Sequence, residues 1–152
     1  MNQKNRISEK IEELLGQCLL AVLATDSSGS PYTSLVGFIA GEDKKTLFFP
    51  TYTDTSKYLN ITENPHVSLL IDSRKNRLED FEKASALTVM GTASRVTEGM
   101  ESAHIASLYL RKYPGLERFI YNAGCAFIQV KVAKYILVAG FHDVHELKVK
   151  HS

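Results

Sequence analysis

The sequence predicts a mainly β fold with some α structure: a small antiparallel barrel in a single domain, flanked by helices. Short segments rich in β-branched and aromatic residues recur along the chain, and dense clusters of turn-forming residues separate them. Six or seven consecutive strands of this kind tend to close on themselves, because closure removes exposed sheet edges. The chain has 152 residues, 44% of them hydrophobic, which suffices for one core, so we expect one domain over residues 1–152.

The first half of the chain is predicted to be a helix followed by a meander of strands. Apolar residues at a spacing of three and four, with Glu and Lys between them, predict the opening helix. Clusters of Asp, Ser, Gly and Pro then separate short apolar runs, and Pro50 is expected to end the third strand. The predicted elements are a helix over 7–15 and strands over 18–25, 32–40 and 46–49.

The second half is predicted to combine long strands with short helices. Asn64-Pro65 stops the helix that follows the third strand. Gly91 lies inside a long β-like segment and predicts a bulge or bend there. The predicted elements are a helix over 57–61, a strand over 66–71, a surface crossing over 72–83, a strand over 84–96, helices over 98–111 and 116–121, a strand over 126–138 and a frayed tail over 148–152.

Charge and cysteine content narrow the classes of partner. The chain has 18 Lys and Arg against 17 Asp and Glu, so no global field favours nucleic acid or an anionic membrane. The N-terminus leads into a charged amphipathic stretch and no apolar run approaches the length of a membrane span, which predicts a cytoplasmic protein with no membrane partner. Cys18 and Cys125 lie in apolar runs without metal-ligand neighbours, so we expect free, buried thiols and no metal site.

A hydroxyl-rich loop over residues 51–57 is the first candidate site. Four hydroxyls and the ammonium of Lys57 cluster at the predicted start of a helix. A helix start offers unpaired backbone N–H groups and a positive dipole end, and Lys57 adds a full charge that can meet a phosphate. The alternative is that Thr55 or Ser56 only caps the helix and Lys57 is solvated.

A longer pattern runs through residues 20–93. It consists, in order, of Ala24-Thr25, Gly29-Ser30-Pro31-Tyr32, Phe48-Phe49-Pro50-Thr51, Ser56-Lys57, Asn64-Pro65-His66-Val67-Ser68-Leu69-Leu70 and Gly91-Thr92-Ala93. This ordered set resembles the pyridoxamine 5′-phosphate oxidase-like FMN-binding split-barrel superfamily, where FMN is flavin mononucleotide. The segment Tyr135–Phe141 resembles a related haem-utilisation branch.

The resemblance implies a split barrel that binds FMN at the interface of a homodimer. Carried onto this chain, it places the flavin-binding contacts on three segments and names no catalytic residue. They are Ser34, Leu35, Val36 and Gly37 on the second strand, Pro50 and Thr51 at the end of the third, and Thr55, Ser56 and Lys57 at the phosphate turn.

The chain departs from the best-known enzyme of this superfamily in three ways. Ser34 and Ser56 replace two arginines, so Arg74, Arg77 or Arg95 could supply the missing charge. The lysine that contacts the substrate phosphate aligns with Ile39, and the C-terminal Arg-x-His element is absent. Vitamin B6 oxidase activity is therefore not expected.

Two classes of function follow. The first is an FMN-dependent oxidoreductase acting on an unidentified small molecule, in which the flavin supplies the redox chemistry. The second is a flavin-binding or haem-binding protein without turnover. His142 and His145 near Glu146 are interpreted as surface residues and not as metal or haem ligands. Three aromatic residues of the late helices either line a pocket over the flavin or pack the core: Tyr109, Tyr113 and Phe119.

Overall fold

The computed structural model describes residues 2–152. Over this range the strands are β1 (Ala21–Ser27), β2 (Ser30–Val36), β3 (Ile39–Ala40), β4 (Thr46–Tyr52), β5 (His66–Asp72), β6 (Ser85–Arg95), β7 (Cys125–Ala139) and β8 (Asp143–Lys148). The helices are α1 (Gln3–Gln17), α2 (Ser56–Glu63), α3 (Asp80–Lys83), α4 (Met100–Lys112) and α5 (Glu117–Ile120).

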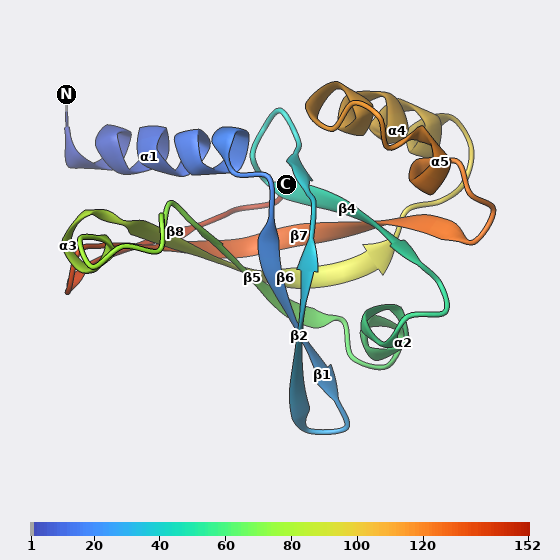
Figure 1. Ribbon diagram of the computed structural model, residues 1–152, viewed down its shortest axis with the longest axis horizontal. Helices are drawn as coiled ribbons and strands as arrows, with labels where there is room; N and C mark the ends of the chain where they lie inside the picture. The colour runs from blue at the N-terminus through green and yellow to red at the C-terminus, as the bar shows by residue number, and fades with distance from the viewer. Residues whose placement is uncertain (1) are drawn as a thin grey trace.

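The eight strands form one sheet in the order β2-β1-β5-β6-β7-β4-β3, with β8 paired to β7, and every pairing is antiparallel. Strand β2 continues into β3 across Gly37 and Phe38, and it also contacts β4, so the sheet curls back on itself. The hairpin of β1 and β2 projects beyond the body of the sheet (Figure 1). The predicted mainly β split barrel with flanking helices is confirmed, with eight strands in place of six or seven.

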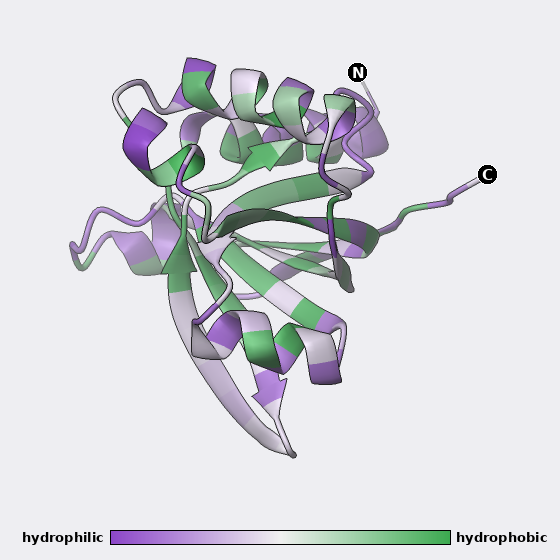
Figure 2. Cartoon of the chain, turned by 90° about the vertical axis from the view of Figure 1, so that its right-hand side faces the viewer, coloured by the Kyte–Doolittle hydropathy of each residue, from purple (hydrophilic) through white to green (hydrophobic). Residues whose placement is uncertain are grey.

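The core fills the inside of this curled sheet. Leu23, Phe49, Leu69, Leu87 and Val130 come from five different strands and are at most 1% exposed. Burying each such side chain stabilises the fold by about 1.5–3 kcal/mol. The apolar stripe of α1 covers one opening of the barrel, and a second cluster lies under α4 and α5. Figure 2 shows hydrophobic residues on the central strands and hydrophilic residues on the outer sides of the helices.

Strand β4 runs past the point where the sequence predicts its end. Pro50 is buried and pairs with Phe127, and the strand continues to Tyr52. Strand β3 pairs only with Leu47 and Phe48, so its pairing with β4 does not extend to Pro50. A proline with no neighbouring strand on its nitrogen side removes no ladder hydrogen bond, which is why the strand tolerates it.

The C-terminal region is more ordered than the sequence predicts. Strand β8 was not expected, and it pairs with β7 from Asp143 to Lys148. Beyond it, the N–H of Val149 donates to the Ala133 carbonyl at 2.9 Å, and Nε2 of His151 lies 2.7 Å from the Val132 carbonyl oxygen. The predicted frayed tail is therefore wrong over these residues.

The bulge predicted at Gly91 is confirmed. The register between β6 and β7 shifts between Met90 and Gly91, and a Cβ atom at Gly91 would overlap the backbone carbonyl of Lys131. Only glycine allows this close approach of two strands. Within residues 2–152, no helix has the length and hydropathy needed to cross a membrane.

Candidate flavin site

Two of the three predicted binding segments adjoin, because the hydroxyls of Thr51 and Thr55 lie 3.0 Å apart where β4 leads into α2. Strand β2, which carries the third segment, contacts both β4 and α2. Two side-chain bonds hold α2 in place against β1. The buried amide of Asn60 donates to Thr25 Oγ1 at 3.0 Å, and the amide of Asn64 donates to Asp26 at 3.3 Å.

Thr55 is the N-cap of α2, as the capping interpretation expected. Its hydroxyl accepts the N–H of Tyr58 at 3.3 Å, lies 3.0 Å from the hydroxyl of Thr51, and is 2.8 Å from the Tyr52 carbonyl. No acidic residue lies in the first turn of α2. The helix therefore presents its positive end and the N–H groups of Ser56 and Lys57, and no carboxylate of its first turn competes for them.

Lys57 is half-buried at the second position of α2. Among the ion pairs formed within residues 2–152, none includes Lys57. A half-buried cation beside a helix start is an arrangement that recognises an anion.

Three of the four predicted residues lie on β2, Gly37 follows it, and the β2 side chains point in two directions. Leu35 is 64% exposed on the outer face, whereas Val36 is buried. Ser34 is the residue with an unsatisfied group: its Oγ is buried and has no hydrogen-bond partner within residues 2–152. Buried hydroxyls normally form hydrogen bonds, so the hydroxyl of Ser34 can still donate and accept one within the predicted binding segment.

Of the three arginines that could add charge, Arg95 alone lies beside α2. Its Nη1 donates to the hydroxyl of Tyr58 at 3.3 Å, and its Nη2 pairs with Glu98 at 2.9 Å. Tyr58 stands in the first turn of α2, so Arg95 joins the end of β6 to the start of that helix.

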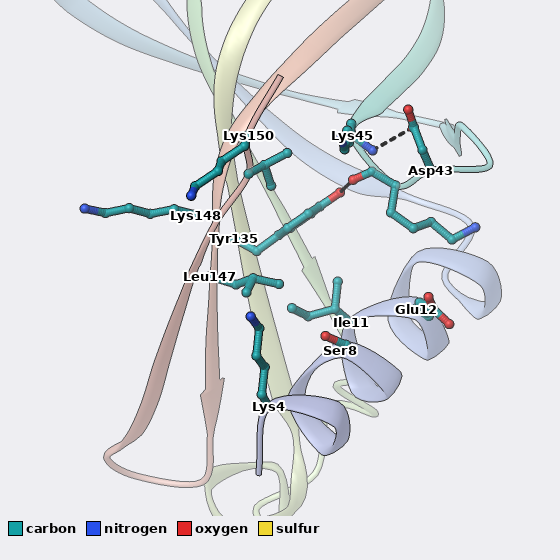
Figure 3. A pocket seen from close by; sticks show the side chains of 12 residues that line it. Lys4, Ser8, Ile11, Glu12, Asp43, Lys45, Tyr135, Leu147, Lys148 and Lys150 are labelled. Carbon is teal, nitrogen blue, oxygen red and sulfur yellow. Dashed lines mark hydrogen bonds between the residues drawn. The ribbon is translucent and has the colours of Figure 1, made fainter. Parts of the chain in front are cut away.

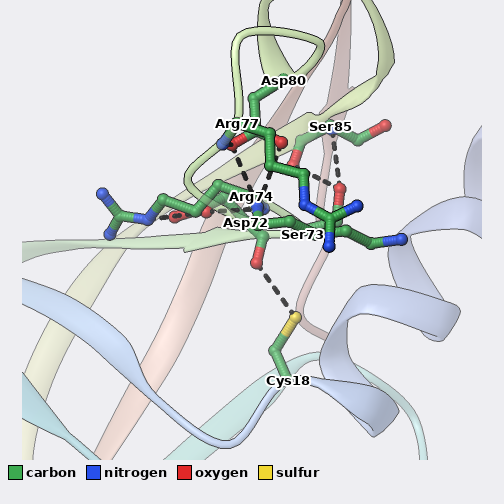
Figure 4. A network of polar contacts seen from close by, with 8 residues as sticks. Cys18, Asp72, Ser73, Arg74, Arg77, Asp80 and Ser85 are labelled. Atoms are coloured by element: carbon green, nitrogen blue, oxygen red, sulfur yellow. Dashed lines mark hydrogen bonds and ion pairs between the residues drawn. The ribbon is translucent and has the colours of Figure 1, made fainter.

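Arg74 and Arg77 belong to the opposite end of the molecule, next to α3 (Figure 1). Figure 4 shows the polar network around them, in which Arg74 pairs with Asp72 at 3.0 Å. The N–H groups of Lys75 and Arg77 donate to Asp80, and these bonds lower the pKa of its carboxyl. The network organises the connection between β5 and β6.

The late aromatic residues are used for packing and clamping. Tyr109 is 1% exposed and stacks on Tyr113, with ring centroids 4.4 Å apart. Phe119 packs against Tyr52 at 5.1 Å. The packing interpretation is confirmed for Tyr109 and Phe119, while Tyr113 has a further role at the end of β2.

The last residues of α4 clamp the link between β2 and β3. The hydroxyl of Tyr113 accepts the N–H of Phe38 at 2.8 Å and lies 2.7 Å from the carbonyl oxygen of the same residue. Lys112 Nζ donates to the carbonyls of Leu15 and Phe38 at 3.0 and 3.1 Å, and lies 4.1 Å from the centre of the Phe38 ring. Tyr113 and Phe38 are 75 residues apart in the sequence, so no local residue pattern predicts their contact.

The remaining candidates are one isoleucine, two histidines and the two cysteines. Ile39 is buried with Tyr109 and Phe127 under α4. His142 is exposed, and His145 Nε2 lies 2.9 Å from Asp143 Oδ1. Over residues 2–152, no three His, Cys, Asp or Glu side chains are grouped so that they could hold a metal ion. Cys18 and Cys125 are free and half-buried, and burial raises the pKa of both thiols.

Solved structures share this architecture. The chain is similar to Campylobacter jejuni ChuZ, with a TM-score of 0.83, 14% identity, and 97% of this chain and 61% of that chain covered. It is similar to a heme binding protein from Mycobacterium smegmatis, with a TM-score of 0.77, 18% identity and coverage of 90% and 57%. It is also similar to General Stress Protein 26 from Bacillus anthracis, with a TM-score of 0.73, 19% identity and coverage of 95% and 99%.

These structural likenesses establish the fold. The chain spans 61% and 57% of the first two proteins. No curated protein matches the chain in sequence. The family model described as pyridoxamine 5′-phosphate oxidase does match it, over residues 7–139. That range contains the curled sheet from β1 to β7, the capped start of α2 and the α4 clamp. The chain therefore belongs to the pyridoxamine 5′-phosphate oxidase-like split-barrel family.

Proposed function

We propose that this protein binds FMN at the site formed by β2, the end of β4 and the start of α2, and that it is an FMN-dependent oxidoreductase for a small molecule. The observation that carries the proposal is the set of polar groups in the predicted binding segments that have no partner within residues 2–152. The N-terminus of α2 has no acidic residue in its first turn, and Ser34 has a buried hydroxyl without a partner. Lys57 adds an ammonium that pairs with no carboxylate of residues 2–152.

These groups fit a phosphorylated flavin. Lys57 and the backbone N–H groups at the start of α2 would hold the phosphate, with the Thr55 hydroxyl fixing the helix end. The hydroxyl of Ser34 would form a hydrogen bond with the ribityl chain or the edge of the flavin ring. Bound flavin supplies hydride and electron transfer, and the protein supplies orientation, charge and exclusion of water. Arg95 is positioned to add a second cation through its contact with Tyr58.

We further propose a two-fold homodimer, with the flavin at its seam. An apolar row crosses three strands on the outer face, because Val22 pairs with Leu35 on β2 and with Leu70 on β5. Leu35 and Leu70 are 64% and 37% exposed, and Leu19 and Leu20 continue the patch at 56% and 57%. A second copy would cover this row. Light scattering tests the dimer: we expect a particle of about twice the 17.0 kDa chain, and a monomer would contradict it.

The cofactor test compares FMN with riboflavin by quenching of flavin fluorescence. The two ligands differ only in the phosphate, so FMN should bind more tightly by about tenfold or more if α2 and Lys57 hold that phosphate. Equal affinity would contradict the phosphate site, and absence of quenching by either ligand would contradict the flavin site.

A protein that binds flavin or haem without turnover is the competing class, and one structural relative is described as heme binding. Absorption spectra of the purified protein, with and without added FMN and haem, distinguish the two cofactors. Oxidation of NADH or NADPH by the FMN-loaded protein, at a rate above that of free FMN, would support an oxidoreductase. No excess rate would favour the binding class.

Ile39 argues against turnover of pyridoxamine 5′-phosphate. Ile39 is buried under α4 and offers no charge to a substrate phosphate. We expect no aldehyde product from this substrate. Robust turnover would show that another cation takes the role of the missing lysine.

A further inference from the structure

A groove on the outer face of the sheet joins β2 to the loop that follows β5. It has a volume of about 580 Å³, which is typical of a small-molecule site. Val22, Leu35 and Leu70 line it from β1, β2 and β5. These three residues are paired across the strands, and directly opposed residues of a sheet share a face, so their side chains point to the same side. Leu35 is also one of the predicted flavin contacts, so the groove adjoins the proposed flavin site.

Most of the groove is apolar. Leu19 and Leu20 extend the row and are 56% and 57% exposed. Cys18 also lines the groove; its S–H donates to the Asp72 carbonyl at 3.3 Å, and burial raises the pKa of this thiol. Cys18 is therefore held in its neutral form and adds no charge to the groove.

The polar end of the groove has hydrogen-bond donors but no net charge. It is formed by Asp72, Arg74 and Asn76, where β5 leads into the loop before α3. Arg74 Nε pairs with Asp72 Oδ1 at 3.0 Å (Figure 4), so the two charges cancel. The ion pair uses the Nε side of the guanidinium, and the N–H groups on Nη1 and Nη2 can still donate. The side-chain amide of Asn76 adds two further N–H groups.

These properties select the chemistry of a ligand. Five apolar side chains suit an apolar body, and the donors at one end suit a carbonyl oxygen. A carboxylate is disfavoured, because it would meet Asp72 beside Arg74. The groove therefore fits a neutral, apolar carbonyl compound. Quinones belong to this class, and they accept two electrons, as a substrate of a flavoprotein must when it reoxidises the flavin.

We propose that this groove binds a quinone, with its ring on Leu20, Leu35 and Leu70 and one carbonyl oxygen at Arg74, and that the quinone is the substrate of this protein. The substrate role rests on the function proposed above. In the reaction the quinone gains two electrons and two protons and becomes a hydroquinone, and the reduced flavin, regenerated by NADH or NADPH, loses the same two electrons and two protons. A second copy on the outer face would close the open side of the groove.

The groove between α1 and β8 is the comparison site (Figure 3). Its volume is about 470 Å³, and Ile11 and Leu147 are among the side chains that line it. None of the described residues around it belongs to the proposed flavin site. A ligand bound there would therefore not adjoin the predicted flavin contacts.

Duroquinone is the probe, because methyl groups occupy every free ring position and a thiol cannot add there. We expect it to shift the ¹⁵N–¹H NMR signals of residues 18–22 and 74–76 in the full chain without flavin. The absence of shifts, or shifts centred on Ile11 and Leu147, would overturn the proposal. Signals of residues 18–22 that change with protein concentration but not with duroquinone would show that a second copy fills the groove, which would also overturn it.

Two matched pairs of variants test the two ends of the groove. Arg74→Met keeps the aliphatic stem but removes the donors and should weaken duroquinone by about tenfold, whereas Arg77→Met changes the same loop outside the groove and should not. Leu20→Ser should weaken it by about threefold or more, whereas Leu78→Ser changes an exposed leucine outside the groove. Equal effects within either pair would overturn the assignment. Unchanged NMR signals away from each substitution verify the fold.

The substrate role has its own measurement. In FMN-loaded protein reduced without oxygen, duroquinone should reoxidise the flavin faster than it reoxidises free reduced FMN. Arg74→Met should slow this by about tenfold at low duroquinone while FMN affinity stays the same. No excess rate over free FMN would overturn the substrate role. Duroquinone binding without FMN binding would contradict the proposed function, whereas FMN binding without duroquinone binding would overturn this inference alone.

Discussion

Lys57 at the start of α2 and Lys112 at the end of α4 differ in what their ammonium groups contact. Lys112 donates to the backbone carbonyls of Leu15 and Phe38, so its charge is used to join α1, the link between β2 and β3, and α4. Lys57 makes no ion pair within residues 2–152 and stands where a helix leaves its first N–H groups free. Lys112 is used within the structure, whereas Lys57 is the lysine that we propose binds the flavin phosphate.

The comparison teaches that the two sides of the proposed flavin site are built differently. On the α4 side, the end of β2 is fixed by internal hydrogen bonds, and burial raises the pKa of Tyr113 to about 12, so its hydroxyl stays protonated in neutral solution. On the α2 side, polar groups remain unused. Substitutions on the first side should therefore change stability, and substitutions on the second should change ligand affinity.

The largest effect on stability is expected from Gly37→Ala. The added Cβ would lie 2.6 Å from the hydroxyl of Tyr109 and 3.3 Å from the ring of Tyr113, two stacked rings that cannot move freely. Overpacking of this kind should lower the free energy of unfolding by about 2–3 kcal/mol, measured by urea denaturation.

A matched control is Gly16→Ala, where nothing lies within 4 Å of the new Cβ and alanine favours the helix. The double variant Gly37→Ala/Tyr109→Phe removes the hydroxyl that the methyl group would meet. It should be more stable than Gly37→Ala alone. If it is not, the clash with Tyr109 is not the cause of the loss.

The next largest effect is expected from Lys112→Met. The change keeps the aliphatic stem but leaves the Leu15 carbonyl without this donor, which should cost about 1–3 kcal/mol of unfolding free energy. Phe38 keeps the hydroxyl of Tyr113, so the loss is partial. Lys131→Met, at an exposed position, should change stability by less than about 0.5 kcal/mol. Equal losses in the two variants would contradict the clamp.

Lys57→Ala should change ligand affinity and leave stability nearly unchanged, in contrast to the two variants above. Unfolding free energy should change by less than about 1 kcal/mol, because the position lies in the first turn of α2 and alanine is a good helix former. FMN affinity should fall by roughly ten- to a hundredfold, while riboflavin affinity stays nearly constant. Fluorescence titration measures both ligands. Unchanged FMN affinity would move the phosphate assignment from Lys57 to Arg95.

A pH dependence of stability is also expected from Lys112. Burial lowers its pKa to about 8 from the ordinary 10.5. Between these two values the unfolded chain holds more protons on this residue than the folded chain, so folding stability rises with pH across that window. Urea denaturation from about pH 7.5 to 10 should show wild type gaining stability relative to Lys112→Met. A constant difference between the two proteins would contradict the lowered pKa.

The sequence by itself predicted those helices, strands and bends that depend on short-range residue patterns. The amphipathic spacing over residues 7–15 identified α1, the turn clusters separated β1, β2 and β4, and Gly91 marked the bulge in β6. The hydroxyl-rich loop before Lys57 likewise indicated a helix start, because the cap is a local property. Anion binding at that helix start stays a prediction.

The tertiary structure decided what depends on partners far away in the chain. Pro50 stays inside β4 because the pairing of β3 with β4 does not extend to it, and β8 forms because β7 is long enough to pair with it. Arg95 stands beside Tyr58, 37 residues away in sequence, while Arg74 and Arg77 lie at the other end of the molecule. Contacts between distant segments determine where a strand loses its partner, whether a lysine is buried and which of the three arginines lies beside α2. Local residue patterns do not encode those contacts.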